Sequence, residues 1–266
     1  MKLERIFDST AFLLRYAWQT YRALFSWLTP GAYLVLKILL PLTQVIFFTL
    51  LGRFAGGDAS YYLVGNATEM VVFTGIAGAM QVISNERDMG TLQYVIIAPQ
   101  NNALTFYART LFLILDGLTS IAVCFLAGLL LFHLDFSHVN WLWLSVDLLI
   151  ISFSVSGLGL ALGVVSLVGV DFNLLLNLAL SVFLVLCGVN FPLARLPLWI
   201  QSIAQLLPLT HGLLAVRAAF AGTTTDIVSN TLAELLIGCI YIGFGSLLFY
   251  YFEYLARKKG TLSLQD

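Results

Sequence analysis

Six long apolar stretches constrain this chain more than any other feature of its sequence. The hydrocarbon core of a bilayer is about 30 Å thick, and roughly 20 helical residues cross it. Each stretch reaches about that length, so we predict an all-α integral membrane protein with six transmembrane helices. The predicted spans are residues 33–52, 61–83, 103–132, 142–168, 172–192 and 229–254.

The composition agrees with a membrane protein and excludes other classes. Hydrophobic residues make up 60% of the 266 residues and charged residues 10%, whereas soluble proteins average about 45–50% and 25%. The net charge of −1 gives no basic excess for binding nucleic acid. The sequence also lacks the Gly-x-x-x-x-Gly-Lys-Ser/Thr pattern that binds nucleotide phosphates. We therefore expect no nucleic-acid partner and no directly bound nucleotide cofactor.

Residues 1–30 carry the pattern of an amphipathic helix. Apolar side chains recur at intervals of three and four residues, with Arg5, Arg15 and Arg22 on the opposite side. Tryptophan and phenylalanine on the apolar face favour a helix that lies in the head-group plane at the cytoplasmic interface. The alternative is a soluble helix that packs on a partner.

The distribution of Lys and Arg predicts the orientation in the membrane. With six spans and the amino end inside, both termini are cytoplasmic, and the outer side holds Arg53, Arg195 and Arg217. The residues on the cytoplasmic side are Lys2, Arg5, Arg15, Arg22, Arg87, Arg109, Arg257, Lys258 and Lys259. This excess places the connection between the second and third spans in the cytoplasm.

Three charged residues follow Asn85 in that connection. Asn85 suits a helix N-cap, acidic residues suit the first helical turn, and Pro99 follows the expected end. The spacing predicts a short helix over residues 85–98 that lies across the cytoplasmic surface. The alternative is a solvated loop with one helical turn. We expect Glu86 to be a surface charge whose reversal hardly affects the bundle.

A short motif in this segment, Glu-Arg-x-x-Gly-Thr-Leu at residues 86–92, resembles the signature of the type-2 ABC exporter permease family. In that family the motif forms the coupling helix, which docks on the ATPase subunit. The usual pattern has Glu where Asp88 and Gln93 stand, so Asp88 keeps the charge and Gln93 removes it. The resemblance implies that the contact with an ABC ATPase subunit involves Glu86, Arg87, Asp88, Gly90, Thr91, Leu92 and Gln93.

The resemblance also implies a division of labour between chains. ATP and Mg would bind to the partner ATPase, so this chain would be a transport subunit and not an enzyme. The membrane part would contain a second permease copy or a sister permease.

The segment between the fifth and sixth predicted spans is neither a clean span nor a polar loop. Apolar residues at helical spacing between its prolines predict two short re-entrant helices in the outer leaflet. A Leu-Pro-x-Thr-His element with Pro208, Thr210 and His211, followed by Arg217, resembles an element that precedes the last span in the same family. The alternative is an interfacial loop anchored by Trp199.

Polar residues inside the predicted spans need a reason, because an unpaired charge there costs several kcal/mol. Lys37 lies near a cytoplasmic end and is expected to reach the interface with its ammonium group. Asp116 falls near mid-span, where it needs a partner or water, and Asp147 and Glu234 lie near outer ends. These residues either line a hydrated path or form hydrogen bonds between helices. The candidate pathway and outer-gate residues are Asp116, Glu69, Asn177, Pro208, Thr210, His211 and Arg217.

Small residues predict where helices pack closely. Gly159 and Gly163 in the fourth span, and Gly75 with Ala79 in the second, allow two backbones to approach each other.

A metal site is a weaker alternative, with His133, Asp135 and His138 as ligands and His211 as a third histidine of an intramembrane hydrolase. These residues alternate as in an irregular loop, and no general base stands near them as in a His-Glu-x-x-His helix. We therefore expect no metal site and no catalytic site.

Together these patterns predict one membrane domain over residues 1–266, with a six-span bundle at 33–254 and a cytoplasmic tail at 255–266. The resemblance implies that it is a type-2 ABC transmembrane domain. The resemblance implies a permease subunit of an ATP-driven exporter in a bacterial cytoplasmic membrane. Its cargo would be an amphipathic or hydrophobic drug, antibiotic or lipid-like molecule. The alternatives are an exporter of a lipid-linked or polysaccharide glycan, an ion-coupled carrier or channel, and an intramembrane enzyme.

Overall fold

The computed structural model describes Trp18, Gln19, Arg22 and residues 29–97, 102–167, 171–223 and 226–259. Over these residues the chain is helical and contains no strand. The predicted interfacial helix lies almost entirely outside the described residues, and so does the tail after residue 259.

Five helical segments are long and apolar enough to cross a membrane, which confirms five of the predicted spans. The first segment consists of α2 (Pro30–Leu34), a π-helical turn η1 (Val35–Leu39) and α3 (Leu40–Phe54). The other four are α4 (Ala59–Asp88), α6 (Asn102–Phe132), α7 (Trp141–Ser166) and α11 (Ile227–Lys259).

The fifth predicted span, residues 172–192, is wrong as a full-length helix. It contains α8 (Phe172–Leu186), which has 15 residues and is therefore about 22 Å long, shorter than a bilayer core. The helix stops because Gly188 adopts a φ of 77°, a left-handed conformation that an α-helix cannot include. Residues 187–192 are irregular.

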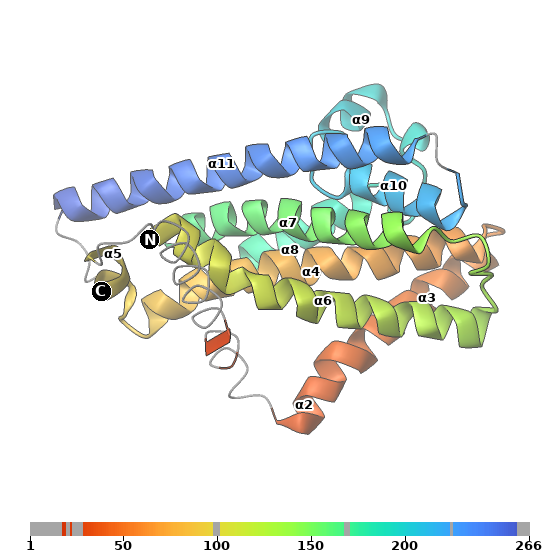
Figure 1. Ribbon diagram of the computed structural model, residues 1–266, viewed down its shortest axis with the longest axis horizontal. Helices are drawn as coiled ribbons and strands as arrows, with labels where there is room; N and C mark the ends of the chain where they lie inside the picture. Colours follow the sequence, from red (N-terminus) through yellow and green to blue (C-terminus); the bar gives the residue numbers. More distant parts are fainter. Residues whose placement is uncertain are drawn as a thin grey trace, which may run out of the picture.

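Short helices follow α8, as the prolines predicted. They are η2 (Leu193–Arg195), α9 (Leu198–Ala204) and α10 (Thr210–Phe220). Figure 1 places α9 and α10 at the end of the bundle opposite the short helix α5 (Leu92–Ile97), which follows α4. The short helices therefore lie at two opposite ends of the bundle, α5 at one end and α9 and α10 at the other.

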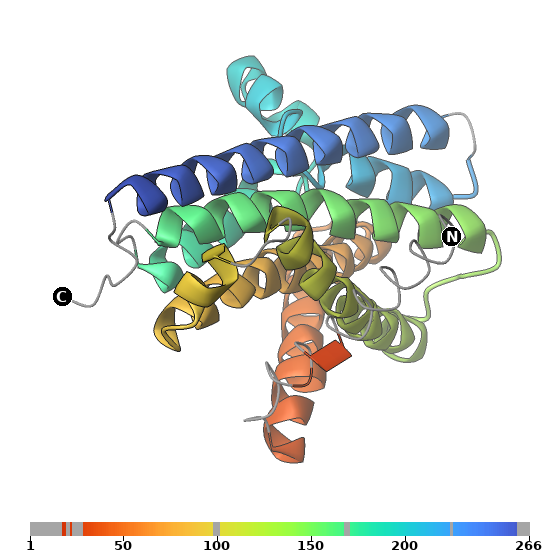
Figure 2. The same ribbon diagram turned by 60° about the vertical axis from the view of Figure 1, so that its left-hand side comes forward.

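Helix α4 lies at the centre of the bundle, where it packs against α6 and α7, and α7 packs in turn on α11 (Figures 1 and 2). A Cβ atom added to Gly159 would lie 2.8 Å from the Cβ of Ala79 and 2.9 Å from the Cα of Ile76. One added to Gly75 would lie 2.5 Å from Val155. The predicted close packing of the second and fourth spans is confirmed. Because lipid tails are as apolar as these side chains, tight packing is what holds the two helices together.

The first segment leans away from the other helices. Figures 1 and 2 show α2 diverging from the bundle, whereas α3 contacts α4. The outward side of α3 is apolar and exposed, with Phe47 60% and Phe54 92% exposed. This side of the molecule is available to lipid or to another chain.

Candidate functional site

The end of α4 and helix α5 form a helix-turn-helix at one end of the bundle (Figure 1). The prediction that Asn85 begins a helix is wrong, because α4 continues through Asn85 to Asp88. Gly90 ends α4 with a φ of 68°, which glycine adopts without a Cβ clash. The N–H of Thr91 then donates to the carbonyl of Glu86 at 2.9 Å, the closing bond of a Schellman motif.

The Glu86 carboxylate ties this turn to α6. It forms an ion pair with Arg109 and accepts a hydrogen bond from the Thr91 hydroxyl. The Glu86 side chain is 18% exposed and the Arg109 side chain 5%. Glu86 is therefore not the surface charge expected from the sequence. Arg109 was not predictable as its partner, because the two residues are 23 positions apart and no periodic pattern links them.

Arg87 ties the same turn to α7. Its Nη1 donates to the carbonyl of Ser166 at 2.9 Å. Ser166 is the last residue of α7, where the helix dipole and the unpaired carbonyls favour a cation. The end of α4 is thus held to both α6 and α7.

The exposed residues of this turn and of α5 include Arg87, Asp88, Met89, Gly90 and Tyr94. We call Asp88, Met89 and Tyr94 the turn surface, because Arg87 also holds α7. Met89 is 72% exposed and Tyr94 68% exposed, and Asp88 is also exposed. The predicted ATPase-contact residues that are only partly exposed are Glu86, Thr91, Leu92 and Gln93. Glu86 and Thr91 hold the turn from partly exposed positions, the turn surface faces solvent, and the exposed Arg87 does both. Met89 and Tyr94 were not among the predicted contact residues, although large side chains in a water-exposed segment were the available signal.

Arg217 on α10 connects three elements at the other end of the bundle. Its Nη1 donates to the carbonyl of Gly188 at 2.9 Å, and its Nη2 donates to the carbonyls of Val189 at 3.0 Å and Tyr61 at 3.3 Å. The guanidinium lies 3.6 Å from the centroid of the Tyr61 ring. Arg217 therefore fixes α10 to the residues after α8 and to the start of α4, a use that suits its planar set of donors.

The other predicted outer-gate residues also make internal contacts. The hydroxyl of Thr210 donates to a carbonyl of α9 at 2.6 Å. Nδ1 of His211 lies 3.4 Å from Oδ1 of Asn230. The carbonyl of Pro208 accepts from the Cys187 thiol at 3.7 Å. These contacts give the outer helices a fixed position on the bundle.

Glu234 on α11 caps α10. Its two carboxylate oxygens accept from the N–H of Leu209 at 2.8 Å and from that of Gly212 at 2.9 Å. This carboxyl group lies at a helix N-terminus, where the backbone N–H groups have no partner inside the helix, and it stabilises Leu209 at a φ of 83°. Asp147 accepts from the Thr231 hydroxyl at 2.6 Å. Glu234 and Asp147 thus both form hydrogen bonds between elements, which was one of the two roles expected from the sequence.

Contrary to the expectation from its sequence position, the Lys37 ammonium group does not reach the interface. Its ammonium group forms an ion pair with Asp116 of α6, and the two side chains are 13% and 2% exposed. The hydroxyl of Tyr33 donates to Asp116 at 3.1 Å, and the hydroxyl of Ser120 donates to the Lys37 carbonyl at 3.2 Å. The expectation that Asp116 needs a partner is confirmed.

The remaining two pathway candidates occupy different environments. Glu69 on α4 is 4% exposed and accepts from the side chain of Gln44 at 3.0 Å. Asn177 is exposed on α8, in a polar stripe with Asn173 and Ser181 at intervals of four residues. The seven candidates therefore occupy separate environments, and their role as pathway or outer-gate residues stays a prediction.

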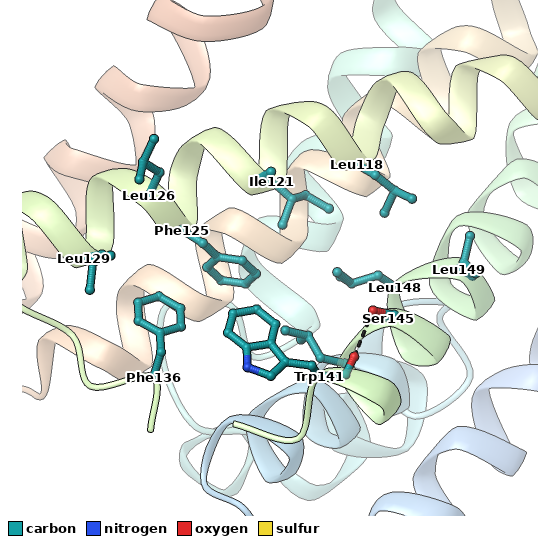
Figure 3. A pocket seen from close by; sticks show the side chains of 12 residues that line it. Leu118, Ile121, Phe125, Leu126, Leu129, Phe136, Trp141, Ser145, Leu148 and Leu149 are labelled. Carbon is teal, nitrogen blue, oxygen red and sulfur yellow. Dashed lines mark hydrogen bonds between the residues drawn. The ribbon is translucent and has the colours of Figure 1, made fainter. Parts of the chain in front are cut away.

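An apolar pocket of about 510 Å³ lies between α6 and α7. Figure 3 shows Phe125 of α6 facing Trp141 at the start of α7, and Phe136 stacks on Trp141 with ring centroids 5.9 Å apart. The hydroxyl of Ser145 in this pocket donates to the Trp141 carbonyl at 2.8 Å. The lining offers no charged group, so the pocket suits an alkyl chain or an apolar ring.

The described residues contain no group of three or more His, Cys, Asp or Glu side chains that could hold a metal ion. Asp135 accepts from the backbone N–H of Ser137 at 2.8 Å. Hydrogen bonds from Ser137 hold the pKa of Asp135 below its usual value. This carboxylate stabilises the turn before α7.

The turn surface lies at one end of the bundle, beside Glu86 and Arg87, which contact α6 and α7. Residues 16–221 match the family described as ABC-2 type transporter, which is more than half of the 266-residue chain. The chain belongs to the ABC-2 type transporter family. No curated protein matches it. The family confirms the resemblance inferred from the motif at residues 86–92.

As an ABC-2 membrane permease, the chain is a multi-pass membrane protein. Permease subunits of this family lack ATPase activity, which lies on a partner nucleotide-binding subunit. The family therefore implies association with an ABC ATPase. It does not specify the cargo.

Proposed function

We propose that this ABC-2 permease is the membrane subunit of an ATP-driven exporter of amphipathic or hydrophobic molecules, such as drugs, antibiotics or lipid-like compounds. Its cargo leaves the cytoplasm or the inner leaflet of a bacterial cytoplasmic membrane. The observation that carries the proposal is the turn surface at the end of α4. Its two large side chains, Met89 and Tyr94, are 72% and 68% exposed. Methionine and aromatic residues are enriched in protein interfaces.

In this proposal the partner ATPase binds ATP and Mg and contacts the turn surface. Closure of the ATPase pushes the turn, and the contacts of Glu86 with α6 and of Arg87 with α7 carry the displacement into the membrane. Such a bundle acts as an element with two arrangements whose equilibrium depends on a ligand bound elsewhere. The sixth crossing is made by α8 with the short helices after it, and both termini lie in the cytoplasm.

A second permease copy or a sister permease covers the exposed sides of α3 and α8. Lipid is a poor neighbour for the polar stripe of Asn173, Asn177 and Ser181, because polar groups in hydrocarbon need partners. Part of this need is met within α8, where Asn177 donates to the Asn173 carbonyl at 2.8 Å and Ser181 to the Asn177 carbonyl at 2.7 Å. A pathway between two permeases gives the remaining amide groups a hydrated environment.

The test replaces each large side chain of the turn surface with a charge. Tyr94→Asp and Met89→Asp are expected to leave folding intact, because exposed substitutions change stability by only about 0.5 kcal/mol. They should reduce copurification of the ATPase and abolish cargo-stimulated ATP hydrolysis in reconstituted vesicles. Thr223→Asp is the matched control, since Thr223 is exposed in the turn after α10 at the other end. Normal copurification and normal stimulated hydrolysis in both turn variants would refute the proposal.

A further inference from the structure

A second cavity, of about 240 Å³, lies beside the ion pair of Lys37 and Asp116. It is enclosed by the first helical segment and by α4, α6 and α8. Thr74, Gln81 and Ser120 add hydroxyl and amide groups to its lining. This cavity differs from the apolar pocket in Figure 3, because it combines two charges with several hydrogen-bonding groups.

The π-helical turn η1 positions Lys37 at this cavity. In η1 the N–H of Leu40 donates to the carbonyl of Val35, five residues earlier, so the helix is locally widened by one residue. The Ser120 hydroxyl holds the Lys37 carbonyl, and the Tyr33 hydroxyl holds Asp116. The pair is thus fixed from both helices, and it joins the leaning first segment to α6.

The charges in the cavity lining cancel. Lys37 and Asp116 are the charged residues among those that line it, so their sum is zero. A net charge in a site of low dielectric is costly, whereas opposite charges that pair with each other are tolerated. A cationic guest or an anionic guest leaves one unbalanced charge, but a guest with both charges can exchange ion pairs with Lys37 and Asp116 and keep the cavity neutral.

We propose that this cavity binds the zwitterionic head group of an amphipathic ligand, with the anion of the ligand on Lys37 and its cation on Asp116. That the ligand is cargo rests on the exporter function proposed above. The binding itself does not, since no ATPase is needed for it. A lipid head group has the same chemistry, and the experiment below separates the two sources.

The dimensions of the cavity agree with a head group that has its chain outside. Pockets that enclose whole drug-sized ligands measure about 300–1,000 Å³, so 240 Å³ holds only part of an amphiphile. Two large apolar side chains of the lining, Leu36 and Phe73, are 39% and 46% exposed. An alkyl chain can leave the cavity along them. Phe172, the first residue of α8, also lines the cavity and places it in the half of the bundle nearer to α5.

The test uses the full chain in nanodiscs of phosphatidylglycerol, which carry no zwitterionic lipid. A photoreactive alkyl phosphocholine is cross-linked to the chain, and dodecylphosphocholine, dodecyltrimethylammonium and laurate compete for the site. These competitors share their chain length and differ in head-group charge. The proposal predicts adducts on the segments that line the cavity, and competition by dodecylphosphocholine that is about tenfold or more stronger than by the other two. Equal competition by the three, or adducts elsewhere, overturns it.

Charge variants predict changes in this order that a purely structural role would not produce. Lys37→Met leaves Asp116 unbalanced, so dodecyltrimethylammonium should become the strongest competitor. Asp116→Asn leaves Lys37 unbalanced, so laurate should become the strongest. The exchange of both residues, Lys37→Asp with Asp116→Lys, should restore the preference for dodecylphosphocholine. Lys258→Met is the control, because Lys258 is exposed at the end of α11, and it should leave the order unchanged.

An unchanged order in Lys37→Met and Asp116→Asn overturns the proposal, whatever the exchanged pair does. If the order changes as predicted, a second experiment with the ATPase present distinguishes a cargo molecule from a membrane lipid as the ligand. Dodecylphosphocholine that stimulates ATP hydrolysis marks a cargo site, and binding without stimulation marks a lipid site. If Tyr94→Asp and Met89→Asp show normal ATPase copurification and normal stimulated hydrolysis while the order of competitors is as predicted, the exporter function is refuted and the binding site is supported.

Discussion

The ion pair between Glu86 and Arg109 should be a main contribution to the position of the turn, and its removal gives the most informative stability experiment. Glu86→Gln keeps the shape of the side chain and an oxygen that can accept from Thr91. It leaves the Arg109 guanidinium, which is 5% exposed, without its carboxylate. Breaking a fully buried pair costs about 3–5 kcal/mol, and an exposed pair is worth about 0–1 kcal/mol. With Glu86 18% exposed, we expect a loss of about 2–4 kcal/mol in the free energy of unfolding.

The reverse truncation should cost less. Arg109→Met keeps most of the apolar stem and leaves a carboxylate that is partly solvated and still accepts from Thr91, so we expect a loss of about 1–2 kcal/mol. The double variant should then lose less than the sum of the two, by about 1–2 kcal/mol, because the second change removes a group that has already lost its partner.

The assay is unfolding by denaturant in mixed micelles, with Asp88→Asn as the control. Asp88 is exposed next to the same turn, so its change should stay within about 0.5 kcal/mol. If the losses caused by the Glu86 and Arg109 variants add within about 0.5 kcal/mol, the ion pair does not hold the turn in place. Reversal by Glu86→Lys is a poor test of partner contact, since it also places a cation beside Arg109.

Three further predictions concern the bundle. Glu234→Gln should lower the free energy of unfolding by about 2–4 kcal/mol in the same assay, because its NH₂ group meets a backbone N–H donor at the start of α10. Asp147→Asn should lower it by less than about 1 kcal/mol. Similar losses for both variants would contradict the capping role. Gly159→Ala should cost about 1–3 kcal/mol by forcing α4 and α7 apart, and an unchanged midpoint would show that this contact is loose. In intact cells an impermeant thiol reagent should label His138→Cys and spare Met89→Cys, and the opposite pattern would reverse the orientation.

Much of the fold was predictable, because the length of an apolar stretch and the positions of small residues can both be read directly from the sequence. Five spans follow from stretches of about 20 apolar residues. The approach of α4 to α7 follows from Gly159 and Ala79, since only small side chains leave room for it. The fifth span was overestimated because apolar composition continues past Leu186. The break comes from the backbone of Gly188, and a glycine inside an apolar run does not reveal whether it will adopt a positive φ.

The candidate site was predictable as a segment but not as a set of contacts. The motif at residues 86–92 located the turn, yet Asn85 was assigned as the start of a helix instead of a position inside one. Gly90 was the clue, because glycine commonly follows the last residue of a helix. The pairing of Lys37 with Asp116 depends on a π-helical turn and on the lean of the first segment. Neither has a periodic signature in the sequence.

The most direct test of the account is a cross-link from the turn surface to the partner ATPase. The photoreactive residue p-benzoylphenylalanine is placed at Tyr94, which is 68% exposed, and as a control at Leu198, which is 80% exposed at the opposite end of the bundle. After illumination of the assembled transporter, we expect an adduct with the nucleotide-binding subunit from position 94 and none from position 198. An intact complex that gives no adduct at position 94, or one only at position 198, would contradict the claim that this turn carries the motion of the ATPase into the membrane.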